Sequence, residues 1–226
     1  MNILYEDNHL LAVDKPAGML VQGDQTGDKP LVDLGKEYIK KKYDKPGDVF
    51  LGVVHRLDRP VSGVVLLART SKALSRMNKL FQDKHITKTY WAVVRERPPR
   101  EEGHLIHWLI KDNKKNQSRA YEQEKKNSKL AQLRYQLIAQ IQGYYLLKVQ
   151  PQTGRPHQIR VQLATMGCPI QGDVKYGYPT PNDNASISLH ARSLSFVHPV
   201  KQELLEIEAP LPKAPYWQRF AEIAES

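Results

Sequence analysis

Residues 54–63 read VHRLDRPVSG, and the apolar run VVLLA that follows at 64–68 is the clearest buried strand of the chain. The carboxylate of Asp58 stands just before this strand, between two arginines. Neighbouring positive charges favour the ionised form of an acid. Pro60 and Gly63 fit a turn, and loops held on a rigid scaffold commonly carry functional residues. By itself, Asp58 could be a nucleophile, a general base, a metal ligand or a plain salt-bridge partner.

Further strand patterns lie on both sides of this segment. Each combines apolar, aromatic or β-branched residues over a short length, and Gln142-Gly143 supplies a hairpin turn between two of them. The predicted strands are 3–6, 10–13, 64–68, 90–94, 133–141, 144–149, 189–197 and 204–207. The Lys-rich stretch 111–129 is interpreted as a solvated excursion in preference to an RNA contact.

Helical patterns are fewer and do not alternate regularly with the strands. Residues 31–42 place apolar side chains on one face, and Thr70 or Ser71 can cap a helix that continues to Phe81. Residues 156–166 begin with Pro and precede Gly167, and 215–225 could form a closing helix. Many strands with few helices predict an α+β fold, with a mainly antiparallel mixed sheet and flanking helices and loops.

The segment TGRPHQIRV at 153–161 is a second candidate for chemistry. If Pro156 opens a helix, His157 and Arg160 share one face and Ile159 points to the core. A fixed guanidinium there suits a carboxylate or a phosphate. The alternative is an arginine on a solvated helix face.

The segment KTYW at 88–91 is a third candidate. In a strand, Tyr90 and Trp91 point to opposite faces, so one ring could stack on a nucleobase while the other joins the core. The alternative places both rings in the core.

Composition narrows the possible classes of function. Lys and Arg exceed Asp and Glu by 34 − 24 = 10, which suits a polyanionic partner without requiring one. Cys168 is the only cysteine, so it is expected to be a small buried residue, with no disulfide and no Cys-based metal site. The histidines lack zinc-site spacing, and the chain has no phosphate-binding glycine motif, so we expect no metal and no nucleotide cofactor. No apolar run is long enough for a membrane span and the N-terminus is unlike a signal peptide, so a cytoplasmic protein is expected.

Taken together and in order, HRLDRPVSG, KTY and TGRPHQIRVQL resemble the signature motifs of RluA-type pseudouridine synthases. VDKPAGMLV, GDVKYG and LHARSLSFVHP add to a resemblance that extends from about residue 3 to residue 210. It implies a single catalytic domain over 1–226, an active-site cleft across the sheet and no N-terminal RNA-binding extension. It also implies a cofactor-free, monomeric enzyme that isomerises uridine to pseudouridine in ribosomal or transfer RNA.

The resemblance also implies roles for individual residues. Asp58 matches the essential aspartate, and Arg160, in preference to Arg155, matches the arginine that ion-pairs with it. Tyr90 matches the tyrosine that packs on the target base, and Arg56 matches the arginine that enters the RNA as the uridine flips out. Three more residues of these motifs are expected to contact RNA: His55, Arg155 and His157. The chain departs from its relatives at Val61, where they usually have Thr, which casts doubt on any hydrogen bond made there.

Overall fold

The structure is a computed structural model that describes residues 1–224. The chain forms two compact units, and each is described by itself. Unit 1 consists of Met1–Thr87 and Ala191–Pro210, and unit 2 consists of Lys88–His190 and Leu211–Ser226. The assignment of all 226 residues to one catalytic domain stays a prediction.

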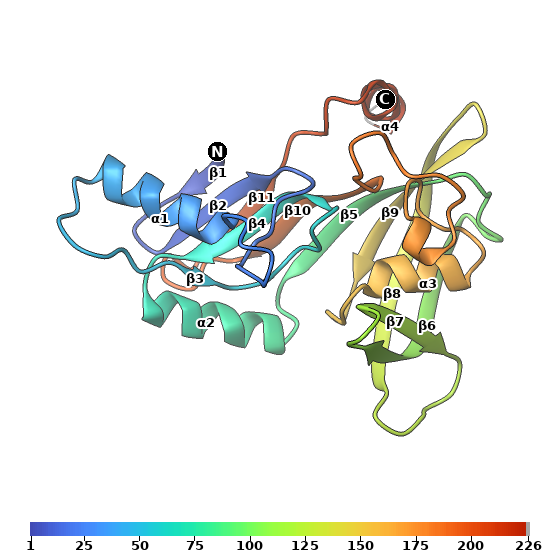
Figure 1. The fold of residues 1–226 in the computed structure, drawn as a ribbon, viewed down its shortest axis with the longest axis horizontal. Helices are drawn as coiled ribbons and strands as arrows, with labels where there is room; N and C mark the ends of the chain where they lie inside the picture. The colour runs from blue at the N-terminus through green and yellow to red at the C-terminus, as the bar shows by residue number, and fades with distance from the viewer. Residues whose placement is uncertain (225–226) are drawn as a thin grey trace. The chain divides into compact units, whose positions relative to one another are not determined.

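Unit 1 is built from short strands and two helices (Figure 1). Its elements are β1 (Asn2–Glu6), β2 (Leu10–Lys15), α1 (Leu31–Lys42), β3 (Gly52–Val53), β4 (Ser62–Ala68), α2 (Ser71–Gln82), most of β10 (Leu189–Val197) and β11 (Leu204–Glu208). The strands run in the order β1-β2-β4-β10, with β3 beside β4 and β11 beside β10. The pairs β1–β2, β2–β4, β3–β4 and β10–β11 are antiparallel.

Strands β2 and β4 are apolar without alternation because both of their faces are covered. Leu10 of β2 belongs to the cluster that contains Met77 of α2. On the other face, a Cβ added at Gly35 of α1 would lie within 4 Å of Leu11 and Leu67. The two helices therefore cover opposite faces of these strands (Figure 1). A strand buried on both faces reads as a continuous hydrophobic run.

Unit 2 contains a sheet whose neighbouring strands all pair antiparallel, together with helical segments. Its elements are β5 (Thr87–Val94), β6 (Glu102–Asp112), β7 (Gln117–Tyr121), β8 (Lys129–Ile141), β9 (Tyr144–Pro151), α3 (Gln158–Thr165), the 3-10 turn η1 (Val174–Tyr176) and α4 (Pro215–Ala224). The strand order is β5-β9-β8-β6-β7. Gln142 and Gly143 both have positive φ, 46° and 80°, as the tight turn between β8 and β9 requires.

The sheet of unit 2 has two faces, which the strand pairing defines. Residues paired across antiparallel strands point to the same face. Tyr90 pairs with Val149, which pairs with Tyr135, and we call this side the Tyr90 face. Lys148 pairs with Trp91 and with Gln136 on the other side, which we call the Arg134 face because Arg134 lies on it two residues from Gln136.

Helices cover parts of both faces. On the Tyr90 face, Val161 of α3 packs against Leu109 and Ala131. On the Arg134 face, Trp217 and Phe220 of α4 pack into the cluster that contains Trp91, Val93, Ala139 and Leu146. The part of the Arg134 face farther from this cluster carries polar side chains instead.

The predicted α+β fold with a mainly antiparallel sheet is confirmed, and so are most of the predicted elements. Residues 31–42 form the predicted helix, and the Thr70 hydroxyl accepts a hydrogen bond from Ala73 N at 3.1 Å as the cap of α2. Glu225, the last residue of the predicted closing helix, lies outside the described residues.

Two predictions of local structure were wrong. The helix expected from Pro156 begins only at Gln158, because His157 has φ 54° and so lies in the left-handed region. The stretch 111–129 is not a simple excursion: it contains β7 and the ends of two neighbouring strands. The strand β6 was missed as well, since polar and apolar residues do not alternate regularly along it.

Within residues 1–224, no helix has both the length and the apolar character that a membrane crossing requires.

Candidate active site

Asp58 lies on the loop that joins β3 to β4 in unit 1, where its side chain is partly exposed. The loop is anchored on both sides of it, because Leu57 and Val61 are buried. The Val61 N–H donates to the Asp58 carbonyl at 3.0 Å, which closes a turn.

A buried lysine binds the backbone of the loop that carries Asp58. Lys15, the last residue of β2, has no exposed surface. Its Nζ donates to the carbonyls of Pro16 at 3.0 Å, Met19 at 2.8 Å and Arg59 at 3.2 Å. The Arg59 carbonyl also accepts from Gly18 N at 2.8 Å. The loop carrying Asp58 and the loop after β2 are therefore joined through one ammonium group.

The electrostatics of Lys15 follow from this position. Burial lowers its pKa from the ordinary 10.5 to about 8, while the negative charge of Asp58 acts in the opposite direction and raises it.

The two arginines that flank Asp58 in the sequence point to different surroundings. Arg59 donates from Nε to the Gly18 carbonyl at 2.9 Å and from Nη2 to Asp28 at 2.6 Å. Its guanidinium therefore fixes the loop after β2. Arg56 is exposed, as a side chain that enters RNA must be.

His55 has a clear role inside unit 1. Its Nε2 accepts a hydrogen bond from Leu66 N at 3.0 Å, and its ring stacks on Phe81 of α2 with the centroids 5.2 Å apart. The ring thereby ties the start of the loop to β4 and α2. Its predicted contact with RNA stays a prediction.

Gly63 allows this loop to enter the sheet. Its φ is 113°, and a Cβ at this position would lie 2.2 Å from the carbonyl oxygen of Ala191. Only a residue without a side chain lets β4 and β10 approach so closely here.

In unit 2, Tyr90 lies in β5 on the Tyr90 face, the face on which α3 packs. Two residues before it, Lys88 donates from Nζ to the Thr153 carbonyl at 3.3 Å. Burial lowers the pKa of Lys88 to about 8. The KTY strand and the TGRPHQIR loop are thus connected within the unit.

The TGRPHQIR loop is held to the sheet by the side chain of Gln158. Its Oε1 accepts from the Thr153 hydroxyl at 2.7 Å and from Arg155 N at 2.9 Å, and its Nε2 donates to the Gln132 carbonyl at 3.0 Å. The Arg155 guanidinium donates from Nε to the Leu130 carbonyl at 2.9 Å. Arg155 therefore stabilises the loop, and the choice of Arg160 over Arg155 as the catalytic arginine stays a prediction.

Arg160 is buried and held from two sides. Its Nε and Nη2 donate to the two carboxylate oxygens of Asp173 at 2.7 and 2.8 Å. Its Cζ lies 5.1 Å from the centroid of the Tyr176 ring. The predicted solvated alternative for this arginine is wrong, since only 5% of Arg160 is exposed.

His157 also contacts Tyr176, through a 2.8 Å hydrogen bond between Nδ1 and the phenol oxygen. His157 and Arg160 do converge, but on a shared tyrosine and not as neighbours on one helix face. The Tyr176 oxygen accepts a further hydrogen bond from Ser118 N at 2.8 Å.

Sequence reasoning missed Lys15, Asp173 and Tyr176. Their segments, VDKPAG and GDVKYG, were noticed for their resemblance, but nothing local indicates their partners. Lys15 meets Arg59, 44 positions away, and Asp173 meets Arg160, 13 positions away. Within residues 1–224, no group of three or more His, Cys, Asp or Glu side chains could share a metal ion.

Comparison with known proteins identifies the family of the chain. Residues 9–165 match the family described as RNA pseudouridylate synthase, and this range contains Asp58, Tyr90 and Arg160. The chain belongs to that family. The protein is an RNA pseudouridine synthase of the RluA type, as the ordered motifs suggested.

Two curated relatives align with most of this chain. Ribosomal large subunit pseudouridine synthase C of Buchnera aphidicola is 35% identical over 218 residues, which is 93% of this chain and 67% of the relative. The tRNA pseudouridine synthase C of Vibrio cholerae is 31% identical over 236 residues, covering 96% of this chain and 93% of the relative. Human RNA pseudouridylate synthase domain containing 4 has the same fold, with a TM-score of 0.81, 24% identity and coverage of 99% of this chain and 93% of the human chain.

Proposed function

We propose that the synthase isomerises uridine to pseudouridine in ribosomal or transfer RNA, with Asp58 as its nucleophile. The substrate classes are those in the names of the relatives from Buchnera aphidicola and Vibrio cholerae. The observation that carries the catalytic assignment is the partly exposed carboxylate on a loop that buried Lys15 anchors through the Arg59 carbonyl. A charged group on a rigid loop is preorganised for attack.

The proposed reaction is an isomerisation, in which no atom is gained or lost overall. The bond from the sugar C1′ to the ring N1 breaks, a bond from C1′ to C5 forms, and the C5 hydrogen leaves as a proton. N1 ends with a proton, so no electron donor or acceptor is required. The Asp58 carboxylate supports this exchange as a nucleophile that splits one hard step into easier ones.

Arg160 is proposed to stabilise the negative charge of Asp58. The bidentate ion pair with Asp173 fixes the plane of this guanidinium. Tyr90, on the same face of the sheet as α3, is proposed to pack on the target base and to assist removal of the C5 proton.

RNA contacts complete the proposal. A base inside a helix must leave its stack, at a cost of a few kcal/mol, and exposed Arg56 is proposed to occupy the space it vacates. Three residues remain proposed RNA contacts: His55, Arg155 and His157. We further propose that the synthase acts as a monomer in the cytoplasm, where its lone buried thiol, Cys168, remains reduced.

Asp58→Asn tests the nucleophile. This substitution should abolish tritium release from C5-labelled uridine in RNA while leaving RNA affinity within a few-fold. Asp28→Asn is a matched control, because it removes an acid that pairs with Arg59 on the surface of the same unit. Substantial turnover by Asp58→Asn would refute the assignment.

Arg56→Ala tests base flipping. The variant should lose more activity on a target within a stem than on an unpaired target, because only the stem requires unstacking. Arg76→Ala, an exposed arginine on α2, controls for the loss of one positive charge. Equal losses of activity on both RNAs would remove the flipping role.

A further inference from the structure

The turn formed by residues 172–177, GDVKYG, contacts the guanidinium of Arg160 through two of its side chains. Asp173 is buried, with 1% of its surface exposed, and accepts two hydrogen bonds from one edge of the guanidinium. Such a bidentate pair fixes the position and the plane of an arginine. The Tyr176 ring adds a cation–π contact.

The backbone of this turn explains how one short segment supplies both contacts. Gly172 and Gly177 have φ of 82° and 99° and flank η1. The Tyr176 N–H donates to the Asp173 carbonyl at 3.0 Å. A Cβ at Gly172 would lie 2.6 Å from the side chain of Asn182. The glycines therefore allow a tight turn that presents an acid and an aromatic ring to the same arginine.

We propose that Asp173 is a positioning residue of the synthase, which holds Arg160 in the orientation that catalysis requires. This inference rests on the proposed function, in which Arg160 is proposed to stabilise the negative charge of Asp58. An arginine side chain has several rotatable bonds, and ordering it during the reaction would raise the barrier. Asp173 orders it beforehand, and misplacement by about 1 Å can cost about a hundredfold in rate.

Asp173→Asn tests this role, because Asn keeps the size of the side chain and removes its charge. We expect kcat to fall by about ten- to a hundredfold with little change in KM for RNA. We also expect the acid limb of the kcat–pH profile to move to higher pH, because a displaced Arg160 favours ionised Asp58 less. A loss of stability alone would reduce the active fraction at every pH and leave the limb in place.

A double-mutant cycle with Arg160→Lys tests whether Asp173 acts through Arg160. Asp173→Asn should then have little additional effect on kcat. Additive effects, or an unchanged acid limb in Asp173→Asn, would overturn the inference. Asp58→Asn separates this from the proposed function: if Asp58→Asn is inactive and Asp173→Asn is normal, the nucleophile stands and the positioning role fails.

A second pair of variants applies if Asp173→Asn does not fold. Tyr176→Phe and Tyr176→Leu both remove the hydroxyl that contacts His157 and Ser118, but only Leu removes the ring beside the guanidinium. The acid limb should move in Tyr176→Leu and stay closer to wild type in Tyr176→Phe. Equal behaviour of the two variants would show that Arg160 is not positioned in this way.

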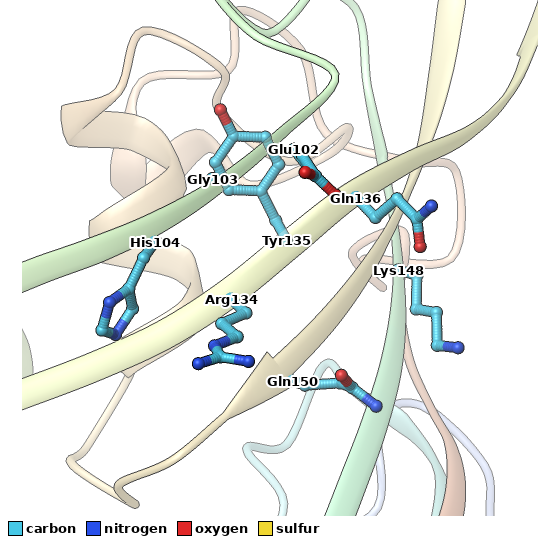
Figure 2. A pocket seen from close by; sticks show the side chains of 8 residues that line it. All are labelled: Glu102, Gly103, His104, Arg134, Tyr135, Gln136, Lys148 and Gln150. Carbon is cyan, nitrogen blue, oxygen red and sulfur yellow. The ribbon is translucent and has the colours of Figure 1, made fainter.

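A different observation concerns the Arg134 face. Strands β6, β8 and β9 surround a hollow of about 450 Å³ on this part of the surface (Figure 2). Arg134 and Tyr135, neighbours on β8, leave the strand in opposite directions, so the charged side chain lies away from the Tyr90 face (Figure 2). The hollow is lined by Glu102, Gly103, His104, Arg134, Tyr135, Gln136, Lys148 and Gln150.

The charges of the hollow are unequal. Arg134 and Lys148 are basic side chains, and neither forms an ion pair within the described part of the chain. His104 adds a third basic side chain, which contacts Gln152 at 3.2 Å. Glu102 is the one acid among the lining residues.

We propose that this hollow binds phosphate groups of an RNA strand, at a second place away from the Tyr90 face. RNA as the partner rests on the proposed function. Arg and Lys neutralise phosphates, and the amides of Gln136 and Gln150 can reach sugar hydroxyls and base edges. The chain's formal charge of +10 favours such a polyanion over a neutral ligand.

Arg134→Gln with Lys148→Gln tests the second contact. Affinity for a large-subunit ribosomal RNA transcript should fall severalfold, and the dependence of log Kd on log salt should weaken by about 1 to 2. Binding of a short uridine oligonucleotide should change little, because it cannot reach both places. Arg76→Gln with Lys72→Gln is the matched control, since it removes the same two side-chain types from the exposed surface of α2.

If RNA affinity fell equally in the test and control variants, net charge alone would explain the loss and the proposal would be overturned. Unchanged RNA affinity with binding of polyglutamate would assign the hollow to an acidic protein partner and also overturn it. Glu102→Gln should strengthen RNA binding, because it removes the acid from the hollow. The salt dependence of RNA binding can also be measured in an Asp58→Asn background. This second contact can therefore be tested separately from the nucleophile.

Discussion

Lys15→Met should destabilise the synthase by about 2 kcal/mol. The Pro16 and Met19 carbonyls would lose their ammonium donor, at about 2 kcal/mol each, and the Arg59 carbonyl, which keeps Gly18 N, would lose about 1 kcal/mol. Met avoids the cost of burying an amine. The drop in pKa from 10.5 to about 8 corresponds to about 3 kcal/mol, which offsets much of the loss.

The pH dependence follows from the same shift. Because the pKa of Lys15 is lower in the folded protein, the unfolded chain binds more protons between pH 8 and 10.5. Folding stability supplied by this group therefore rises with pH through that window. In Lys15→Met this rise is absent, so the difference in stability between the two proteins should grow from pH 8 to pH 10.5.

Urea unfolding followed by circular dichroism measures both effects as shifts in the midpoint. Lys72→Met, an exposed lysine on α2, is the control and should change the midpoint little. Under conditions where Lys15→Met is folded, turnover should also fall, because the loop that carries Asp58 loses an anchor. An unchanged midpoint and normal turnover for Lys15→Met would refute the reasoning.

Two further predictions concern unit 1. Burial would raise the pKa of Asp7, but hydrogen bonds from the N–H groups of His9 and Leu10 outweigh it and lower the pKa to about 2. Asp7→Asn should therefore cost about 2 kcal/mol at neutral pH, a difference that shrinks as the pH falls from 3.8 to about 2 in acid unfolding experiments; a constant difference down to pH 2 would contradict this. Gly63→Ala should cost about 3 kcal/mol or more, because its Cβ meets the Ala191 backbone, whereas Gly143→Ala, with positive φ and open space around it, should cost about 1 kcal/mol in thermal melts. Similar losses for the two glycine variants would show that the close approach at Gly63 carries no cost.

Local patterns in the sequence determined most of the secondary structure. The continuous apolar run at 64–68 indicated a buried strand, and Gln142-Gly143 indicated the turn between β8 and β9. The cap at Thr70 was also readable, because a hydroxyl three residues before a free N–H is a local arrangement. These features depend on neighbours within a few positions of one another.

The ordered motifs likewise determined the family and the candidate residues Asp58, Tyr90 and Arg160. What they left open was how each side chain is held. A lysine at the end of an apolar strand reads as a surface residue, since burying an ammonium is costly unless several acceptors converge on it.

Only the tertiary structure decided which residues meet. Lys15 is buried because three carbonyls from two loops surround its Nζ, and Arg160 is buried because the turn at 172–177 brings Asp173 and Tyr176 to it. The start of α3 at Gln158 also depends on distant contacts, since the bonds of Gln158 to Gln132 accompany the left-handed backbone at His157. Propensity and periodicity act over a few residues, whereas a buried charge is stabilised only by partners that folding brings from elsewhere in the chain.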